Sequence, residues 1–139
     1  MAGVIALDAS VLIAILDEDD AHHATTTTTL ARYSTEDWAV SALTLAEVLV
    51  RPAGDADSAA EAGEHLTELD LTVVDLRDVD AEELATLRSR TGLRMPDCCV
   101  LLVSATHGAA IATIDEALRR AALALGLEVV ELLPWLTPE

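Results

Sequence analysis

Short apolar runs alternate with longer helical segments along the whole chain, and this alternation limits what the chain can fold into. The runs with the length and β-branched content of buried strands are residues 4–7, 38–41, 72–75, 109–113 and 128–131. The helical segments between them are residues 10–16, 21–33, 43–50, 57–69, 81–90, 96–106 and 115–125. Five consecutive threonines, residues 25–29, weaken the second of these, so we expect it to be mobile or bent. The alternation predicts an α/β fold with a parallel sheet and helices on both faces.

The 139 residues fit one domain with a real hydrophobic core, so we expect residues 1–139 to form a single domain. Cys98 and Cys99 are adjacent, which gives neither a metal-ligand spacing nor an easy disulfide, and we expect both to pack inside a helix. No run approaches the roughly 18 to 20 apolar residues of a membrane span, and the N-terminal run lacks a basic leader. We therefore expect a cytoplasmic protein that does not enter the membrane.

The net charge is −17, and all eight basic residues are arginines. Such a chain repels a polyanion, and aromatic side chains for base stacking make up only 2% of it. Nucleic-acid binding would therefore need bound cations, a locally basic patch or a basic partner. The few arginines are either placed for use in binding phosphate or carboxylate, or a result of biased genome composition.

Asp8 interrupts the most apolar stretch near the N-terminus, residues 4–16. Burying a carboxylate among core residues is costly unless a partner or a cation meets it. Asp8 directly follows the first predicted strand, and open α/β sheets bind their ligands at the carboxyl ends of their strands. Asp8 is therefore a candidate site residue.

Three more acids follow strands or begin helices. Glu47 follows the second strand, Asp97 follows Pro96 at the start of an apolar helix, and Asp115 follows the fourth strand. We expect them to converge with Asp8 at one edge of the sheet. Clustered carboxylates repel one another and are stable mainly with a divalent cation, and oxygen ligands suit Mg²⁺ or Mn²⁺. One or two such ions could direct water onto a phosphodiester.

Each acid also has a purely local interpretation. Glu47 with Thr44 has the spacing of a helix capping box, and Asp115 could cap its own helix. Asp97 would favour the helix dipole, and Asp8 could close a local turn.

Two hydroxyls and three arginines are further candidates. Ser10 and Thr113 lie two residues from Asp8 and from Asp115, where they could steady a carboxylate or a metal-bound water, or simply cap locally. Arg94, Arg119 and Arg120 flank the expected site and are our candidates for contact with RNA phosphates.

Read together, residues 7–12, 41–49, 93–97 and 112–115 resemble the PIN domain, and specifically the VapC toxins of bacterial type II toxin-antitoxin pairs. The resemblance implies a PIN-like three-layer α/β/α sandwich with a five-stranded parallel sheet. It also implies a Mg²⁺-dependent endoribonuclease in which Asp8 and Asp97 are the principal metal ligands. Glu47 and Asp115 match the supporting acids of that site, and the hydroxyls above match positions that accompany them.

The resemblance also implies partners. A VapB-like antitoxin wraps such toxins and blocks the site, often with a basic side chain, and the toxins frequently form homodimers. The acidic charge of this chain suits a basic inhibitor. Cys98 and Cys99 stand where small apolar residues are usual, and basic residues near the site are sparse, which leaves RNA binding less well supported.

Two other functions compete with this interpretation. One is a catalytically silent PIN-like domain that binds only metal or a partner, although all four acids are present. The other is a phosphoacceptor signalling domain, which uses a lysine that this chain lacks.

Overall fold

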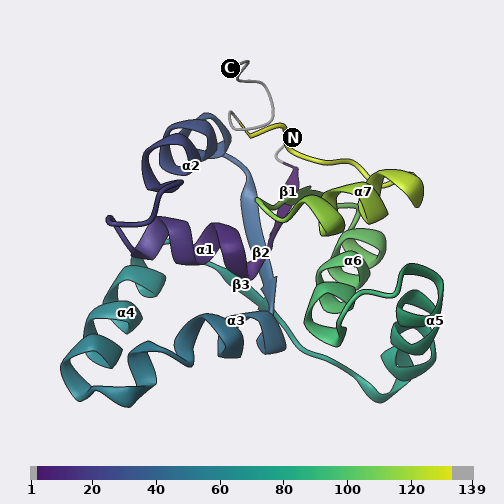
Figure 1. Ribbon diagram of the computed structural model, residues 1–139, viewed down its shortest axis with the longest axis horizontal. Helices are drawn as coiled ribbons and strands as arrows, with labels where there is room; N and C mark the ends of the chain where they lie inside the picture. The colour runs from purple at the N-terminus through teal and green to yellow at the C-terminus, as the bar shows by residue number, and fades with distance from the viewer. Residues whose placement is uncertain (1–2, 133–139) are drawn as a thin grey trace.

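The computed structural model describes residues 3–132 as a parallel sheet with helices packed on both of its faces (Figure 1). The four strands pair in the order β3-β2-β1-β4 and are β1 (Val4–Leu7), β2 (Asp37–Ser41), β3 (Thr72–Val74) and β4 (Ala110–Ala112). The α-helices are α1 (Ala9–Leu16), α2 (His23–Leu30), α3 (Ala42–Leu49), α4 (Ala56–Glu68), α5 (Ala81–Thr91), α6 (Met95–His107) and α7 (Glu116–Ala124). All strand pairs are parallel, which confirms the expected α/β fold.

Alternate residues of β1 face two separate hydrophobic clusters. Ile5 and Leu7 pack with Val11 and Leu12 of α1, whereas Ala6 packs in the cluster that contains α6. This is the two-residue period of a strand that is covered on both sides. The result is a three-layer arrangement with the sheet in the middle.

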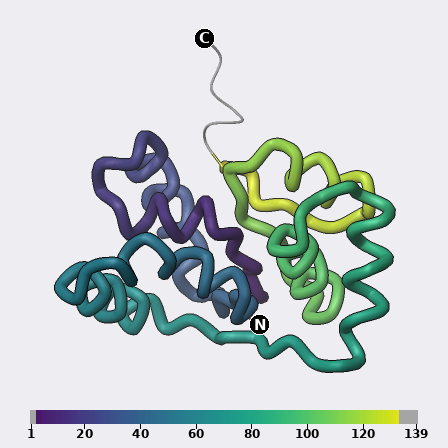
Figure 2. Tube along the Cα trace, turned by 60° about the horizontal axis from the view of Figure 1, so that its bottom comes forward, coloured from purple at the N-terminus to yellow at the C-terminus, as the bar shows by residue number. Residues whose placement is uncertain are grey.

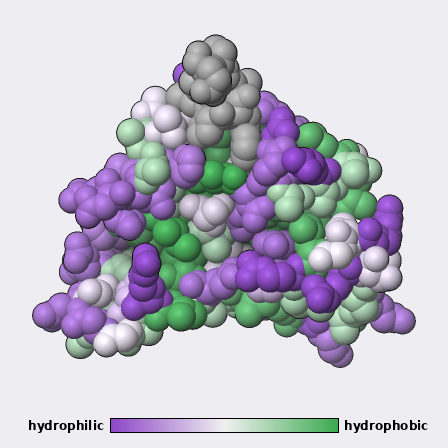
Figure 3. Space-filling view, viewed as in Figure 1, coloured by the Kyte–Doolittle hydropathy of each residue, from purple (hydrophilic) through white to green (hydrophobic). Residues whose placement is uncertain are grey.

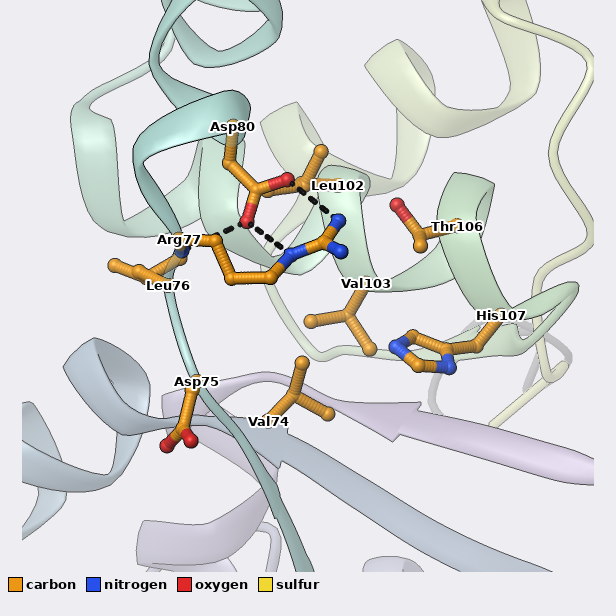
Figure 4. A pocket seen from close by; sticks show the side chains of 9 residues that line it. All are labelled: Val74, Asp75, Leu76, Arg77, Asp80, Leu102, Val103, Thr106 and His107. Atoms are coloured by element: carbon orange, nitrogen blue, oxygen red, sulfur yellow. Dashed lines mark hydrogen bonds and ion pairs between the residues drawn. The ribbon is translucent and has the colours of Figure 1, made fainter.

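The chain fills the two helical layers one after the other. Helices α1 to α4 gather on one side of the molecule and α5 to α7 on the other, and the segment after β3 crosses between them (Figure 2). Asp80 fixes this segment: its carboxylate accepts a hydrogen bond from the backbone N–H of Arg77 at 2.9 Å and pairs with the Arg77 guanidinium at 3.2 Å. Figure 4 shows this pair above a hollow of about 220 Å³ that Val74, Val103 and His107 help to line.

The fifth strand is reduced to one residue pair within the described residues. Val129 forms an isolated parallel bridge with Ile111, through hydrogen bonds from Ile111 N to Glu128 O at 2.9 Å and from Val130 N to Ile111 O at 2.8 Å. The partner strand β4 has only three residues, which limits the pairing that this edge can offer. Residues 128–131 therefore extend the sheet beside β4 without forming a full strand.

The threonine tract lies in a helix, as the sequence predicts for residues 21–33. Residues His23–Leu30 form a continuous helix in which Thr26 and Thr29 are buried. Thr27 Oγ1 donates to His23 O at 2.9 Å, a local bond that the helix tolerates. Packing of α2 against α1 outweighs the weak intrinsic helix propensity of threonine.

None of the helices within residues 3–132 combines the length and the apolar character that crossing a bilayer requires.

Candidate functional site

Asp8 is buried at the end of β1 and is surrounded by hydrogen-bond donors. Its Oδ2 accepts hydrogen bonds from Ser10 Oγ and from Thr113 Oγ1, each at 2.7 Å. Its Oδ1 accepts one from the backbone N–H of Ala9 at 2.8 Å. Hydrogen bonds of this kind fix the orientation of a carboxylate. The charge that interrupts the apolar run is thus held in place by its neighbours.

The two hydroxyls join the ends of β1 and β4. Thr113, fully buried, also accepts a hydrogen bond on Oγ1 from the backbone N–H of Asp115 at 2.9 Å. Ser10 Oγ accepts one from the backbone N–H of Ile114 at 3.1 Å. Ser10 and Thr113 therefore orient the Asp8 carboxylate and tie the loop before α7 to the start of α1.

Asp97 lies in the first turn of α6 and is 8% exposed. Burial and the negative charges of Asp8, Asp115 and Glu47 raise its pKa to about 6, although the positive charge of Arg94 opposes this rise. A neighbouring charge changes a pKa this way only when it is close. The charges of Asp8, Glu47 and Asp115, which come from three other stretches of the chain, therefore act on Asp97.

Glu47 lies six residues into α3 rather than at its start. The cap of α3 is Ser41, whose Oγ accepts a hydrogen bond from the backbone N–H of Thr44 at 3.1 Å. The capping-box interpretation of Glu47 is therefore wrong. Glu47 instead pairs with Arg94 at 3.7 Å, and the same guanidinium lies 4.0 Å from Asp97.

For Asp115 the local interpretation is confirmed. Its Oδ1 caps α7 by accepting a hydrogen bond from the backbone N–H of Leu118 at 3.1 Å. Asp115 is exposed, and its charge is among those that raise the pKa of Asp97. A capping role and a place at the acidic site are thus combined in one residue.

The arginines proposed to contact phosphate have different surroundings. Arg94 contacts two of the acids and has a side chain that is 71% exposed. Arg119 pairs with Glu131 at 3.4 Å and is 22% exposed, whereas Arg120 pairs with Glu116 at 3.2 Å and is 76% exposed. Arg94 and Arg120 are therefore open to a ligand, and Arg119 is mostly covered.

The donor chemistry of the site suits a hard divalent cation. Four carboxylates supply only oxygen ligands, and burial together with the neighbouring acids raises the pKa of Asp97 to about 6. Within residues 3–132, however, no three acidic, histidine or cysteine side chains lie close enough together to hold a metal ion as they stand. Arg94 contacts both Glu47 and Asp97, so a shared ion requires these side chains to draw together and Arg94 to move.

A groove between α1, α3 and α4 adjoins the acids and was not foreseen from the sequence. It has a volume of about 400 Å³, and Ile13, Leu16 and Val48 line its apolar part. Figure 3 shows hydrophobic surface over α1 and α3 bordered by hydrophilic side chains. Glu47 lines this groove and also belongs to the acidic site, so the two features are continuous. The signal in the sequence was the uninterrupted apolar run 11–16, too broad for one buried helix face.

Cys98 and Cys99 are free and fully buried in α6, as the sequence predicts. Burial raises the pKa of both thiols, that of Cys99 to about 11. The two cysteines are core residues of the α6 layer.

These features define a parallel α/β protein whose carboxylates gather at the carboxyl edge of the sheet. Residues 5–123 match the family model described as PIN domain. The chain belongs to the PIN domain family, which confirms the family expected from its sequence. No curated protein matches it in sequence.

Solved structures share the fold at low sequence identity. FitAcB from Neisseria gonorrhoeae is 22% identical with a TM-score of 0.72, covering 94% of this chain and 98% of that one. VapC20 of Mycobacterium tuberculosis, described as a toxin that cleaves the sarcin-ricin loop, is 21% identical with a TM-score of 0.69, covering 84% and 94%. A toxin-antitoxin complex from Klebsiella pneumoniae is 20% identical with a TM-score of 0.63, covering 80% and 86%.

Proposed function

We propose that this chain is a divalent-metal-dependent endoribonuclease and the toxin of a VapBC-type toxin-antitoxin pair. The observation that carries the proposal is the buried position of Asp97 beside the other acids, where burial and the charges of Asp8, Asp115 and Glu47 raise its pKa to about 6. Such a cluster is suited to bind a cation. Membership of the PIN family and the likeness to the M. tuberculosis toxin support nuclease chemistry.

In this proposal the acids have unequal parts. Asp8 and Asp97, the buried members of the four, are the principal ligands of Mg²⁺, for which Mn²⁺ can substitute. Glu47 and Asp115 are more exposed and support the ion or its bound water. The bound ion would supply a polarised water and neutralise charge on the phosphodiester.

The rest of the chain orients these groups. The hydroxyls of Ser10 and Thr113 hold Asp8 Oδ2 in a fixed direction, so that only part of the lone-pair capacity of Asp8 faces the site. Arg94, close to both Glu47 and Asp97, can exchange its carboxylate contacts for a substrate phosphate once a cation neutralises the acids. The site would operate where its RNA substrate lies, in the cytoplasm.

The antitoxin, in this proposal, binds the groove between α1, α3 and α4. The apolar floor at Ile13, Leu16 and Val48 suits the apolar face of a helical segment. Three acids, Asp17, Glu47 and Glu61, line the same groove against one arginine, Arg51, and this excess of negative charge favours a basic segment, as does the net charge of −17. A segment in this groove would reach the acids through Glu47. Homodimerisation, which the resemblance implies, stays a prediction.

Cleavage of a structured RNA by the purified chain tests the enzymatic proposal. We expect cleavage that requires Mg²⁺ or Mn²⁺, stops with a chelator, and falls by about 100-fold or more in Asp8→Asn and in Asp97→Asn because each removes a principal ligand. Asp57→Asn, an exposed acid on α4, is the matched control and should cleave as the unmodified chain does.

Two outcomes would contradict the proposed ribonuclease activity of the acidic site. Undiminished cleavage in both Asp8→Asn and Asp97→Asn would mean that the activity comes from elsewhere. Metal binding without cleavage of RNA would favour the silent PIN-like domain instead.

A further inference from the structure

The positive charge of this chain is concentrated in one segment. Residues 88–120 carry five of the eight arginines against three acids, a net charge of +2, whereas the rest of the chain carries −19. Two of the three acids in the segment, Asp97 and Asp115, belong to the acidic site. The segment therefore holds the positive charge available to draw a polyanion to that site.

The fold gathers part of this charge around one hollow. Arg90, in the last turn of α5, and Arg120, in the second turn of α7, line a hollow of about 460 Å³ between the two helices. Ala117, Ala121 and Ala124 form the α7 wall, and their short side chains leave room beside the guanidinium groups. Two arginines from different helices thus flank one open space.

Arg90 is available for a ligand. It is exposed, and among residues 3–132 its side chain has no hydrogen bond or ion pair. Arg120 is 76% exposed and is held only by Glu116 on its own helix at 3.2 Å, a surface pair of little net value. Each of these guanidinium groups can therefore engage a phosphate at small cost to the fold.

The hollow adjoins the segment that carries Arg94. Leu93 lines the hollow, and the next residue, Arg94, contacts Asp97 at 4.0 Å. Arg90, Arg120 and Arg94 thus form a path of positive charge that ends at the proposed metal ligands. We propose that this path, which we call the α5–α7 track, binds the sugar-phosphate backbone of the RNA beside the bond to be cut. This inference rests on the proposed ribonuclease function and names a residue, Arg90, that the sequence did not indicate.

Binding of a labelled RNA oligonucleotide, measured by fluorescence anisotropy, tests the track. The Asp97→Asn background prevents cleavage during the measurement. Adding Arg90→Ala and Arg120→Ala together should lower RNA affinity by about tenfold and should flatten the dependence of affinity on salt, since each lost phosphate contact removes about 0.7 from the slope for a single strand. Arg32→Ala, an exposed arginine in the turn Ala31–Tyr33, is the matched control and should leave both quantities unchanged.

A second measurement separates a binding role from a purely structural one. In the cleaving chain, the double substitution should reduce cleavage of a long RNA more than cleavage of a dinucleotide, because only the long RNA reaches the hollow. Equal losses on both substrates would indicate damage to the fold and would contradict the track. A role of Arg90 at the α5 dipole would change the melting temperature and leave RNA affinity unaltered, which also contradicts it.

The remaining outcomes identify which proposal has failed. Equal RNA affinity in the double variant and in Arg32→Ala overturns the track, whereas absence of cleavage by the unmodified chain overturns the ribonuclease. Displacement of the RNA by poly-glutamate of equal charge, lost in the double variant, would assign the surface to an acidic peptide and would also overturn the track.

Discussion

Thr113 donates its hydroxyl hydrogen to Asp8 Oδ2 at 2.7 Å across a separation of 105 residues. This contact joins the carboxyl ends of β1 and β4 at the acidic site. Thr113 also accepts the backbone N–H of Asp115, so one buried hydroxyl positions two of the four acids. The rigidity of the site therefore depends on a residue that need not touch the metal.

Thr113→Val keeps the shape of this side chain and removes its hydroxyl. The Asp8 carboxylate loses one of its three hydrogen-bond donors, so we expect a loss of about 1.5–3 kcal/mol in the free energy of unfolding, measured with urea, and weaker binding of Mn²⁺. Thr86→Val, whose exposed hydroxyl bonds only within α5, is the control and should change either quantity little. Equal losses of unfolding free energy and of Mn²⁺ binding in the two variants would contradict a specific role of the Thr113 hydroxyl at Asp8.

Asp97→Asn should make the metal-free protein more stable at neutral pH while it abolishes metal-dependent activity. The pKa of Asp97 is about 6 in the folded chain against an ordinary value of 3.8, so the folded state holds the proton more tightly. This tighter binding of the proton by Asp97 stabilises the folded state fully below about pH 4, and the stabilisation is lost as the pH rises through 6. Asparagine removes this loss, which is on the order of 2–3 kcal/mol.

Urea unfolding from pH 4 to pH 7 in a chelator measures this effect. The stability of Asp97→Asn relative to the unmodified chain should increase across this range. Asp57→Asn, an exposed acid outside the cluster, should show no such trend. A relative stability that stays flat would contradict the mutual repulsion of the acids.

Arg94→Gln should bind divalent ions more tightly. Arg94 contacts both Glu47 and Asp97, and its positive charge opposes the rise in the pKa of Asp97. Because its side chain is 71% exposed, the gain in Mn²⁺ affinity should be modest, about two- to fivefold. Titration with Mn²⁺, with Arg32→Gln for comparison, measures it. Weaker binding in Arg94→Gln would show that the guanidinium supports the metal instead of competing with it.

Ile13→Asp should disrupt binding of the antitoxin. Ile13 is 36% exposed on α1 and lines the groove beside Glu47, where a carboxylate would oppose an apolar segment. Co-purification of the chain with the proposed antitoxin, taken as the product of the adjacent reading frame, measures the effect. Leu123→Asp, a comparably exposed apolar residue on α7, should still co-purify. Loss of the partner in both variants, or in neither, would contradict the proposal that the antitoxin binds this groove.

Cys98 and Cys99 should not react with iodoacetamide in the folded protein at pH 8. Both are fully buried, and burial raises the pKa of Cys99 to about 11, so the reactive thiolate is scarce. Intact-mass measurement should show no adduct before urea is added and two afterwards. Rapid labelling in the absence of urea would mean that α6 opens readily.

Features that depend on neighbours in the sequence were predicted well. The first strand has the bounds expected for it, residues 4–7, because a short β-branched run ends at a charge. The placement of Asp8 and Asp115 just beyond two neighbouring strands also followed from the sequence, since parallel strands bring their carboxyl ends to one edge of the sheet.

Features that depend on contacts between distant segments were not predictable in the same way. The role of Arg90 requires α5 and α7 to face one hollow, and the spacing of residues along the sequence does not indicate this arrangement. The ion pair between Arg94 and Glu47 likewise joins the start of α6 to α3, two helices that are far apart in the sequence. At the threonine tract, burial against α1 outweighs the weak helix propensity of threonine, and the sequence alone does not reveal this burial.

Binding of Mn²⁺, followed by electron paramagnetic resonance, tests the central claim most directly, which is that four acids from separate elements form one cation site. Asp8→Asn, Glu47→Gln, Asp97→Asn and Asp115→Asn should each weaken the same binding event, most strongly for the two buried aspartates, and Glu64→Gln on α4 should leave it unchanged. A chain that binds no Mn²⁺ at millimolar concentrations, or whose binding is indifferent to Asp8 and Asp97, would contradict the claim.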